Sequence, residues 1–421
     1  MKKVLVIGPL LTRSGYGEHA RFVVDSLLSK PELYDVYIHP LSWGKSSWSY
    51  DHDYKRQMYE FLIQKKESYN GEYDFSLQIT IPNEFVHAAP INIGVTAGVE
   101  TTTVPREWIM RSNSMDKLIV TSQFTKSSFD DTEYEVEAQM NDEIQKFKGV
   151  AKPIEVVTYP IKDEEGKIDS EKLSCVTTDF NFLTIAQMAP RKNLEQTIAC
   201  FVDEFRDNEN VGLIIKSHAQ NHSIMDRDLT ERALFPSVQR LGERKCKIYH
   251  IHGDMDECEI QGLIRHPKVN AYCTTTFSEG FGLPLFDAAA AGVPIVAPKF
   301  SGYLDFLHIP KKNNKGKITK DFCFEPIKVE IKEIPPHAVM PDILLEGSKW
   351  GYPDYDKTKK ALKNVYTKYV AKKKIAENLQ SYVLEEFSRD RQLERMCEAI
   401  RTGYENETVD WNNKMSEVKV L

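Results

Sequence analysis

The sequence predicts an α/β protein that contains two doubly wound domains, each built on a parallel sheet. The chain has 421 residues, which is more than one ordinary core holds. Short apolar runs typical of buried strands are followed by helical patterns, as at 4–8 before 18–28 and at 180–186 before 194–205. Residues 269–298 are predicted to form a strand, a glycine-rich turn, an alanine-rich helix and a second strand. This unit is the repeating element of a parallel α/β sheet.

The composition is that of an ordinary globular protein and excludes some function classes. Hydrophobic residues make up 41% of the chain and charged residues 28%. The net charge of −7 provides no overall attraction for nucleic acid or acidic lipid. No apolar run is long enough for a transmembrane helix, and the apolar stretch at the N-terminus is too short for a signal peptide. The seven Cys residues are odd in number and have no Cys-x-x-Cys spacing, so we expect buried free thiols and a cytoplasmic location.

The first domain is predicted to span residues 1–170. Its strands are expected at 4–8, 35–41, 75–81, 91–97, 117–122 and 154–160. The turn after the first strand contains Gly15 and Gly17, whose backbone N–H groups can approach a phosphate. Glu100 follows the fourth strand and is therefore expected at the carboxyl edge of the sheet, where such sheets bind ligands. The polar segment 162–179 has no clear periodicity and is predicted to link the two domains.

The second domain is predicted to span residues 171–388. Its strands are expected at 180–186, 211–217, 247–253, 269–275 and 294–298. The turn after its first strand carries Arg191 and Lys192, two cations that can neutralise a diphosphate leaving group. Lys216 lies near the end of the next strand, at the same edge of the sheet. A final helical segment, 389–421, is expected to form a separate element at the end of the chain.

The most informative stretch begins at Glu279, in the turn of the 269–298 unit. Gly280 and Gly282 allow their backbone N–H groups to approach a ligand closely, and the following helix N-terminus favours oxygen-rich or anionic groups. Asp287 lies eight positions after Glu279, about one turn inside the helix. Two carboxylates that face one cavity can each accept a pair of hydroxyl hydrogen bonds, which suits the vicinal diols of a sugar and a ribose. A tight turn with a capping Glu and a solvated Asp is the alternative interpretation.

The segment from Glu279 to Asp287, with Gly-Phe-Gly-Leu-Pro inside it and Gly-Val-Pro-Ile-Val after it, resembles the E-x7-E signature of retaining GT-B glycosyltransferases of the family 4-like group. The second carboxylate is Asp here where that family usually has Glu. A second segment, in which Glu100 and Thr101 precede a Pro-x-x-Trp helix, is similar to a recurrent element of the same enzymes. The resemblance implies two Rossmann-like domains that face each other across a cleft. It also implies that the final helix crosses back onto the first domain.

The resemblance further implies transfer of a sugar, with retention at the anomeric carbon, from a UDP- or GDP-linked sugar to a hydroxyl acceptor. In these enzymes the departing phosphate takes the proton of the acceptor. The resembling family needs no bound metal, so no metal and no separate cofactor is expected. The catalytic residues are then Glu279, Lys192, Arg191 and Glu100. The donor-binding residues are Gly15, Gly17, Gly280, Phe281, Gly282, Leu283, Asp287 and Lys216. Within this set, Glu279 orients the sugar, Asp287 binds the ribose, and Glu100 binds an acceptor hydroxyl or stabilises positive charge on the sugar.

Three alternatives remain open at this stage. The first is a sugar phosphorylase with the same fold. The second is a glycosyltransferase that modifies DNA bases, because Ser14 to Arg21 vaguely resembles enzymes of large tailed phages and the lysine-rich segments 311–320 and 359–374 can bind a nucleic-acid backbone. The third is a non-catalytic nucleotide-sugar binder. The sequence does not specify the donor sugar, the base, the acceptor or the oligomeric state.

Overall fold

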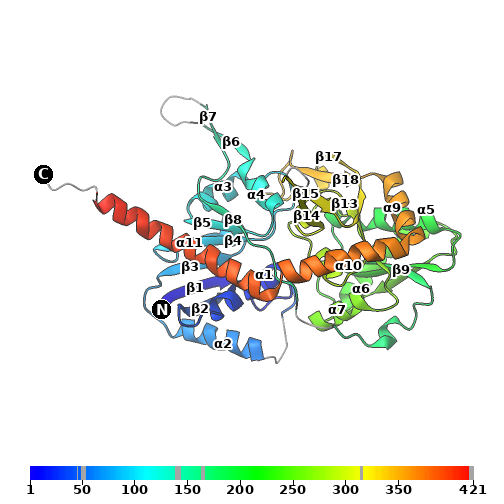
Figure 1. Ribbon diagram of the computed structural model, residues 1–421, viewed down its shortest axis with the longest axis horizontal. Helices are drawn as coiled ribbons and strands as arrows, with labels where there is room; N and C mark the ends of the chain where they lie inside the picture. Colours follow the sequence, from blue (N-terminus) through cyan, green and yellow to red (C-terminus); the bar gives the residue numbers. More distant parts are fainter. Residues whose placement is uncertain (45, 49–53, 138–143, 163–165, 313–315, 417–421) are drawn as a thin grey trace. The chain divides into compact units, whose positions relative to one another are not determined.

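The computed structural model describes residues 1–44, 46–48, 54–137, 144–162, 166–312 and 316–416 (Figure 1). The chain divides into two compact units. The first unit comprises Met1–Pro160, Val339–Ser348 and Arg389–Leu421, and the second comprises Ile161–Ala338 and Lys349–Ser388. The second unit therefore begins at 161 rather than at the expected 171, and a short segment from within it belongs to the first unit.

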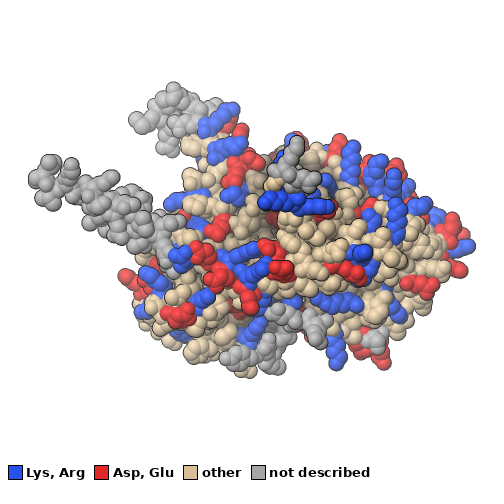
Figure 2. All heavy atoms as spheres, viewed as in Figure 1, with Lys and Arg blue, Asp and Glu red and all other residues tan. Residues whose placement is uncertain are grey.

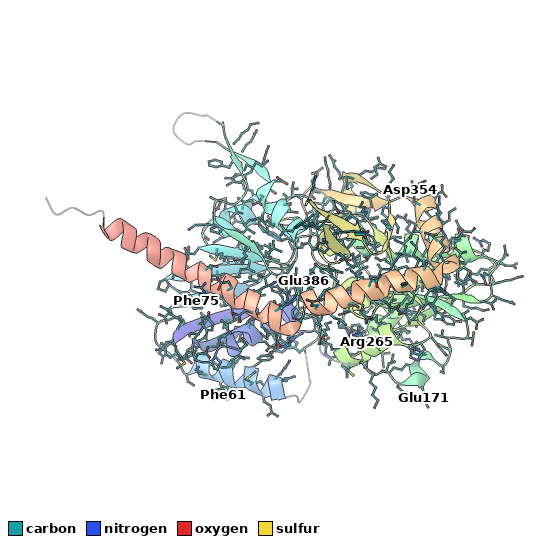
Figure 3. All side chains as sticks on the ribbon, in the orientation of Figure 1. Phe61, Phe75, Glu171, Arg265, Asp354 and Glu386 are labelled. Carbon is teal, nitrogen blue, oxygen red and sulfur yellow. The ribbon has the colours of Figure 1, made fainter. Side chains whose placement is uncertain are left out.

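The first unit contains a six-stranded parallel sheet with the strand order β2-β1-β3-β4-β5-β8. Its strands are β1 (Lys2–Gly8), β2 (Tyr34–Pro40), β3 (Phe75–Ile79), β4 (Ile91–Thr96), β5 (Lys117–Val120) and β8 (Ile154–Val156). They correspond to the six predicted strands, although β8 ends at 156 rather than 160. Most apolar side chains of this sheet are buried, as Phe75 in β3 shows, whereas Phe61 of the flanking helix α2 is 63% exposed (Figure 3).

Five helices and one hairpin accompany this sheet. They are α1 (Gly15–Leu28), α2 (Tyr54–Glu67), α3 (Arg106–Asn113), α4 (Gln123–Asp130), α11 (Arg389–Ser416) and the hairpin of β6 (Glu133–Glu137) with β7 (Ile144–Lys148). Helix α11 lies beside α1, and its Met396, Ala399 and Ile400 are buried in the core of the first unit (Figure 1). Lys117 of β5 donates a hydrogen bond to the backbone oxygen of Ala399 (2.7 Å). These contacts explain why the end of the chain belongs to the first unit.

The second unit contains another six-stranded parallel sheet, with the strand order β11-β10-β9-β12-β13-β16. Its strands are β9 (Phe180–Gln187), β10 (Val211–His218), β11 (Lys247–Ile251), β12 (Ala271–Cys273), β13 (Ile295–Pro298) and β16 (Glu325–Ile327). The helices are α5 (Leu194–Phe205), α6 (Ile224–Gln239), α7 (Glu257–Arg265), α8 (Leu283–Ala290), α9 (Tyr355–Thr367) and α10 (Tyr369–Glu386). Because β9 and β12 are parallel neighbours, the turns that follow them meet at one edge of the sheet.

Several irregular segments differ from the sequence-based expectation. The predicted linker 162–179, of which 163–165 lie outside the described residues, packs onto the second unit through the buried side chains of Leu173 and Val176. The lysine-rich segment 311–320, of which 313–315 lie outside the described residues, contributes to an antiparallel hairpin of β14 (His308–Lys312) and β15 (Ile318–Phe322). A further hairpin pairs β17 (Val329–Glu333) with β18 (Lys349–Pro353). The lysine-rich segment 359–374 spans two helices, α9 and α10, because the backbone leaves the helical conformation at Lys368.

The surface and the cysteines agree in part with the composition-based expectation. Figure 2 shows basic and acidic side chains interspersed over the visible face, without a large area of one sign. All seven cysteines are free thiols; five are buried, but Cys175 is exposed and Cys258 is partly exposed, so the expectation of burial was wrong for these two. Among the described residues, no helix has both the length and the apolar character that a membrane crossing requires.

Candidate functional site

The turn after β9 is tied to the turn after β12 by reciprocal hydrogen bonds. Pro190–Lys192 forms one turn of 3-10 helix, and Asn193 then adopts a left-handed conformation (φ 50°) before α5 begins. The Asn193 amide donates to the backbone oxygen of Thr275 (3.1 Å), and the Thr275 hydroxyl donates to the backbone oxygen of Asn193 (2.8 Å). Asn tolerates this conformation better than most residues. The two turns are therefore held together by backbone and side-chain contacts before any charged group is considered.

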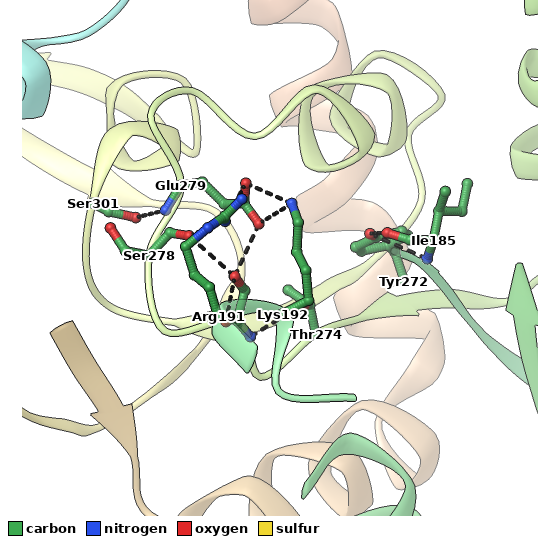
Figure 4. A network of polar contacts seen from close by, with 9 residues as sticks. Ile185, Arg191, Lys192, Tyr272, Thr274, Ser278, Glu279 and Ser301 are labelled. Atoms are coloured by element: carbon green, nitrogen blue, oxygen red, sulfur yellow. Dashed lines mark hydrogen bonds and ion pairs between the residues drawn. The ribbon is translucent and has the colours of Figure 1, made fainter. Parts of the chain in front are cut away.

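Buried Glu279 and the partly buried Arg191 and Lys192 form one ionic cluster on these turns (Figure 4). Lys192 Nζ lies 2.7 and 2.8 Å from the two carboxylate oxygens of Glu279, and Arg191 Nη1 lies 2.9 Å from Oε2. Arg191 also donates to the backbone oxygen of Ser278. The Thr276 hydroxyl donates to Glu279 Oε1 (2.9 Å). The structure thus brings together three of the four predicted catalytic residues.

The electrostatics of the cluster keep Glu279 ionised. Burial raises the pKa of its carboxyl group. The nearby charges of Arg191 and Lys192, together with hydrogen bonds from Lys192 and Thr276, outweigh burial and lower the pKa to about 2. Two cations then share one carboxylate, so these three side chains carry one net positive charge. Such a cluster can accept a further anionic group, because the first carboxylate neutralises only half of the positive charge.

The backbone around Glu279 is packed too closely for side chains at two glycines. Gly282 caps α8 in a left-handed conformation (φ 94°). A Cβ atom on Gly302 would lie 2.0 Å from the backbone oxygen of Gly280. The Glu279 N–H donates to the Ser301 hydroxyl (2.9 Å; Figure 4). The Gly302 N–H donates to the Glu279 backbone oxygen (3.0 Å). The turn 279–282 and the turn 301–302 therefore support each other, which fixes the direction of the Glu279 side chain.

Two further predicted donor-binding residues on this turn have different surroundings. Leu283, the first residue of α8, is half-buried. Phe281 is buried in an aromatic cluster, with its ring centroid 5.1 Å from that of Phe286 and 5.0 Å from that of Phe306. Only the backbone of Phe281 is therefore available for a donor, since its side chain belongs to the core.

Asp287 lies on α8 and is buried, but it pairs with a different cation from those that pair with Glu279. Its Oδ2 atom lies 3.3 Å from Nζ of Lys162, which also lies 3.1 Å from Glu257. Burial raises the pKa of Asp287, and the charge of Lys162 and the hydrogen bond from its ammonium oppose this only in part. The ion pair of Lys162 with Asp287 joins the start of the second unit to α8. Binding of a ribose by Asp287 stays a prediction, and it requires the Lys162 ammonium to share this carboxylate.

Lys216 is buried on β10 and contacts the next loop of the sheet rather than the Glu279 cluster. Its Nζ atom donates to the backbone oxygen of Gly253 (2.7 Å). Burial lowers the pKa of Lys216 to about 8, although the charge of Asp254 opposes the shift. The side chain therefore holds the loop after β11 in place, and its predicted role in donor binding is not tested by this geometry.

In the first unit the structure joins the Gly15–Gly17 turn to the loop before Glu100. Helix α1 begins at Gly15, earlier than the predicted 18, because the Ser14 hydroxyl caps it by accepting from the Gly17 N–H (3.0 Å). The Tyr16 hydroxyl lies 2.8 Å from the Thr96 hydroxyl and accepts from the Gly98 N–H (3.0 Å). Burial raises the pKa of Tyr16 to about 12, and the charge of Glu100 adds to this shift.

The sequence-based prediction missed three residues of these networks. Thr276 positions Glu279, Tyr16 connects two loops of the first unit, and Lys162 pairs with Asp287. A signal was present for Thr276, which ends a run of three threonines directly before the Glu279 turn. The partner of Lys162 lies far away in the chain, so no local pattern identified it.

Comparisons with known proteins identify the fold. No protein-family model and no curated protein sequence matches the chain. Among solved structures, the Anabaena protein Alr3699/HepE in complex with UDP-glucose is similar over 96% of this chain and 100% of its own, with a TM-score of 0.60 and 13% identity. Sucrose-phosphate synthase from Thermosynechococcus elongatus covers 96% and 99% of the two chains, with a TM-score of 0.59 and 12% identity.

A glycosyltransferase from Rickettsia africae is similar over 96% of this chain and 99% of its own, with a TM-score of 0.55 and 15% identity. The described residues of this chain form two parallel six-stranded sheets, and the similarity to these structures extends over nearly the full length of both chains. The chain has the GT-B fold. The predicted fold class is thereby confirmed, and at this level of identity the similarity establishes the fold alone.

Proposed function

We propose that the protein is a retaining glycosyltransferase that moves a sugar from a nucleotide diphosphate sugar to a hydroxyl acceptor. The observation that carries the proposal is the ionic cluster of Glu279, Arg191 and Lys192 on the adjoining turns after β9 and β12. The proposal is supported by the fold, since the similar Anabaena structure contains UDP-glucose. It is also supported by the position of the cluster at the carboxyl edge of a parallel sheet, where such folds bind nucleotides.

The two cations are proposed to stabilise the leaving group. Breaking the bond between sugar and phosphate places negative charge on the diphosphate, and fixed positive charges lower the free energy of that state. Arg191 and Lys192 already contact one carboxylate at 2.9 and 2.7 Å, so a diphosphate would share them with Glu279 rather than recruit them from solvent. The Arg191 side chain is held by its hydrogen bond to the Ser278 backbone oxygen, and the Glu279 carboxylate is held by the Thr276 hydroxyl, which reduces the reorganisation that the reaction needs.

Glu279 is proposed to orient the sugar. An ionised carboxylate accepts two hydroxyl hydrogen bonds, and its low pKa keeps it an acceptor throughout the ordinary pH range. A carboxylate beside the anomeric carbon also stabilises the positive charge that develops on the ring. The departing phosphate is proposed to take the acceptor proton on the same face, which yields retention. We propose no metal requirement, because the two cations supply the positive charge at the diphosphate.

The first unit is proposed to bind the acceptor. Glu100 follows a loop that Tyr16 fastens to the start of α1, so its backbone is held in place. Its carboxylate can accept a hydrogen bond from an acceptor hydroxyl. In this conformation the Gly17 N–H donates to Ser14, so phosphate binding by that group would require the cap to open.

The test is a turnover assay with UDP- and GDP-linked sugars. Many glycosyltransferases can be followed through release of the nucleoside diphosphate, and here water can replace the unknown acceptor. We expect at least one donor to release its nucleoside diphosphate, and NMR of the product to show retained configuration. The rate of release should not fall when a chelator is added, and it should fall at least about 100-fold in Lys192→Ala. Release that depends on inorganic phosphate would instead indicate a phosphorylase. Donor binding without release, in every acceptor mixture tried, would indicate a non-catalytic binder and contradict the proposal.

A further inference from the structure

Helix α6 exposes its apolar side and buries polar groups, which is the reverse of an ordinary surface helix. Its inward positions include the buried residues Asp226, Thr230 and Leu234, of which only one is apolar. Its outward positions include four large apolar side chains: Ile224 (86% exposed), Met225 (79%), Leu229 (51%) and Phe235 (46%).

The exposed apolar residues share one face with two charged residues. At about 100° per residue, Ile224 and Phe235 lie within about 20° of each other around the helix axis, and Met225 and Leu229 lie on the opposite border about 100–140° from Ile224. Asp228 and Arg232, both exposed, lie between these borders. We call this set of six residues the α6 face.

The orientation of α6 is fixed by buried hydrogen bonds, so the outward side cannot simply turn inward. Asp226 accepts from the backbone N–H groups of Gln220 (2.7 Å) and His222 (3.0 Å). The same carboxylate lies 3.2 Å from Nε2 of His252, in the loop after β11. Ser223 caps the helix by accepting from the Asp226 N–H. Rotating α6 to bury its apolar side would break these contacts and expose a buried carboxylate network.

We propose that the α6 face binds the α6 face of a second copy of this chain, with the two helices antiparallel and related by a two-fold axis. In the register centred on position 230, Asp228 of each copy lies opposite Arg232 of the other. Met225 then lies opposite Phe235, and Ile224 lies opposite Pro236. Each copy thus supplies both halves of every apolar contact and of both ion pairs.

Charge complementarity is what favours a second copy over an unrelated partner. Among the described residues, neither Asp228 nor Arg232 has an ion pair of its own, whereas the neighbouring Arg227 and Glu231 already pair with each other (2.8 Å). A register centred on 228 or on 232 places like charges opposite each other at the axis, which is unfavourable. Only the register centred on 230 combines two ion pairs with apolar contacts, so the α6 face specifies its own complement.

The dimer is expected to be weak. Two helical faces of this length bury less than the roughly 1,200–2,000 Å² that stable interfaces bury, and part of the α6 face is charged. We therefore expect a dissociation constant in the micromolar range, and dimers that appear only as the protein concentration rises. This inference does not depend on the proposed function.

The experiment is sedimentation velocity of the full chain from roughly 1 to 200 µM, a range that brackets such an affinity. The wild type should shift from monomer to dimer. Asp228→Arg and Arg232→Asp should each dissociate at least about tenfold more readily, because each variant places like charges opposite each other twice. An equimolar mixture of the two variants should recover the dimer as a heterodimer, and the double variant Asp228→Arg/Arg232→Asp should recover it as a homodimer. Glu209→Arg, an exposed charge reversal outside α6, is the matched control and should leave the wild-type behaviour unchanged.

All of these substitutions are on exposed side chains, so folding is expected to be unaffected, and circular dichroism checks this. A wild type that stays monomeric across the whole range would overturn the proposal. So would a dimer that neither charge reversal weakens, since its interface must then lie elsewhere. Failure of the mixed variants to restore association would contradict the antiparallel register.

Discussion

Replacing Glu279 with Gln should weaken folding and yet strengthen the binding of a nucleoside diphosphate. The substitution keeps the shape of the side chain but removes the carboxylate that Arg191 and Lys192 share. Without it, the two cations lose the anion inside the protein that competes with a bound diphosphate. The account therefore predicts opposite signs for two measurable quantities, the free energy of unfolding and the free energy of ligand binding.

The cost in stability follows from the pKa of Glu279. Its carboxyl group has a pKa of about 2 in the folded protein against an ordinary pKa of 4.5, and a difference of this size corresponds to about 3 kcal/mol in favour of the ionised form. Because the folded pKa is depressed, this stabilisation is present above pH 4.5 and is lost as the pH falls toward 2. Glu279→Gln should therefore lose about 3 kcal/mol at pH 7, and the difference from wild type should shrink below pH 4.5.

The gain in binding follows from the removed charge. A negative charge about 6 Å from a phosphate costs on the order of 1–3 kcal/mol at the effective dielectric constant of protein sites, so Glu279→Gln should bind UDP or GDP about 5- to 100-fold more tightly. Turnover should fall at least about 100-fold, because the carboxylate that is proposed to orient the sugar is lost. Isothermal titration calorimetry measures the binding, and urea denaturation followed by circular dichroism measures the stability.

Asp25→Asn is the matched control, because Asp25 is also a carboxylate flanked by an arginine and a lysine. It pairs with Arg389 and Lys55 and accepts a hydrogen bond from Tyr59 in the first unit. This variant should lose stability without any change in the affinity for UDP or GDP. The reasoning about Glu279 is refuted if the folded Glu279→Gln variant binds the nucleoside diphosphates of active donors with unchanged or weaker affinity.

Three further predictions concern stability. Burial lowers the pKa of His19 to about 3, so the free energy of unfolding of the wild type should fall as the pH drops from 6.5 toward 3. In urea denaturation, His19→Phe should make the free energy of unfolding less dependent on pH over this range. An unchanged pH dependence would contradict burial of the neutral ring. Gly17→Ala should destabilise the protein by more than about 1 kcal/mol although Ala favours helices, because the Ala Cβ would lie 2.2 Å from the backbone oxygen of Thr12. A rise in the melting temperature of this variant would exclude the close contact. Lys162→Met should raise the already elevated pKa of Asp287 further, so this variant should lose more stability at pH 8 than at pH 4.5. Equal losses at both pH values would count against the ion pair of Lys162 with Asp287.

The fold could be predicted because its central strands are buried on both faces and stand out as apolar runs. The turns after β9 and β12 were located for the same reason, which placed Arg191, Lys192 and Glu279 at one edge of the sheet before their contacts were known. Parallel sheets bring the carboxyl ends of neighbouring strands together, so sequence position alone predicted proximity.

Other features depend on contacts between distant parts of the chain, or on patterns that mislead. Helix α6 was missed because its apolar residues face outward, so the usual pattern of a helix packed on a core is absent. The segment 162–179 was interpreted as a linker because it is polar, yet Lys162 pairs with Asp287, which is far away in the sequence. Phe281 was assigned to donor binding from its place in a motif, whereas its ring completes an aromatic core. In each case the decisive interaction lies outside the local window.

The measurement that tests the central claim most directly is a crystal structure of the protein with a nucleoside diphosphate for which binding has been measured. The account predicts phosphate oxygens within hydrogen-bond distance of the Arg191 guanidinium and the Lys192 ammonium, with the Glu279 carboxylate still beside both. A well-ordered diphosphate bound anywhere else, with the three side chains unchanged, would contradict it.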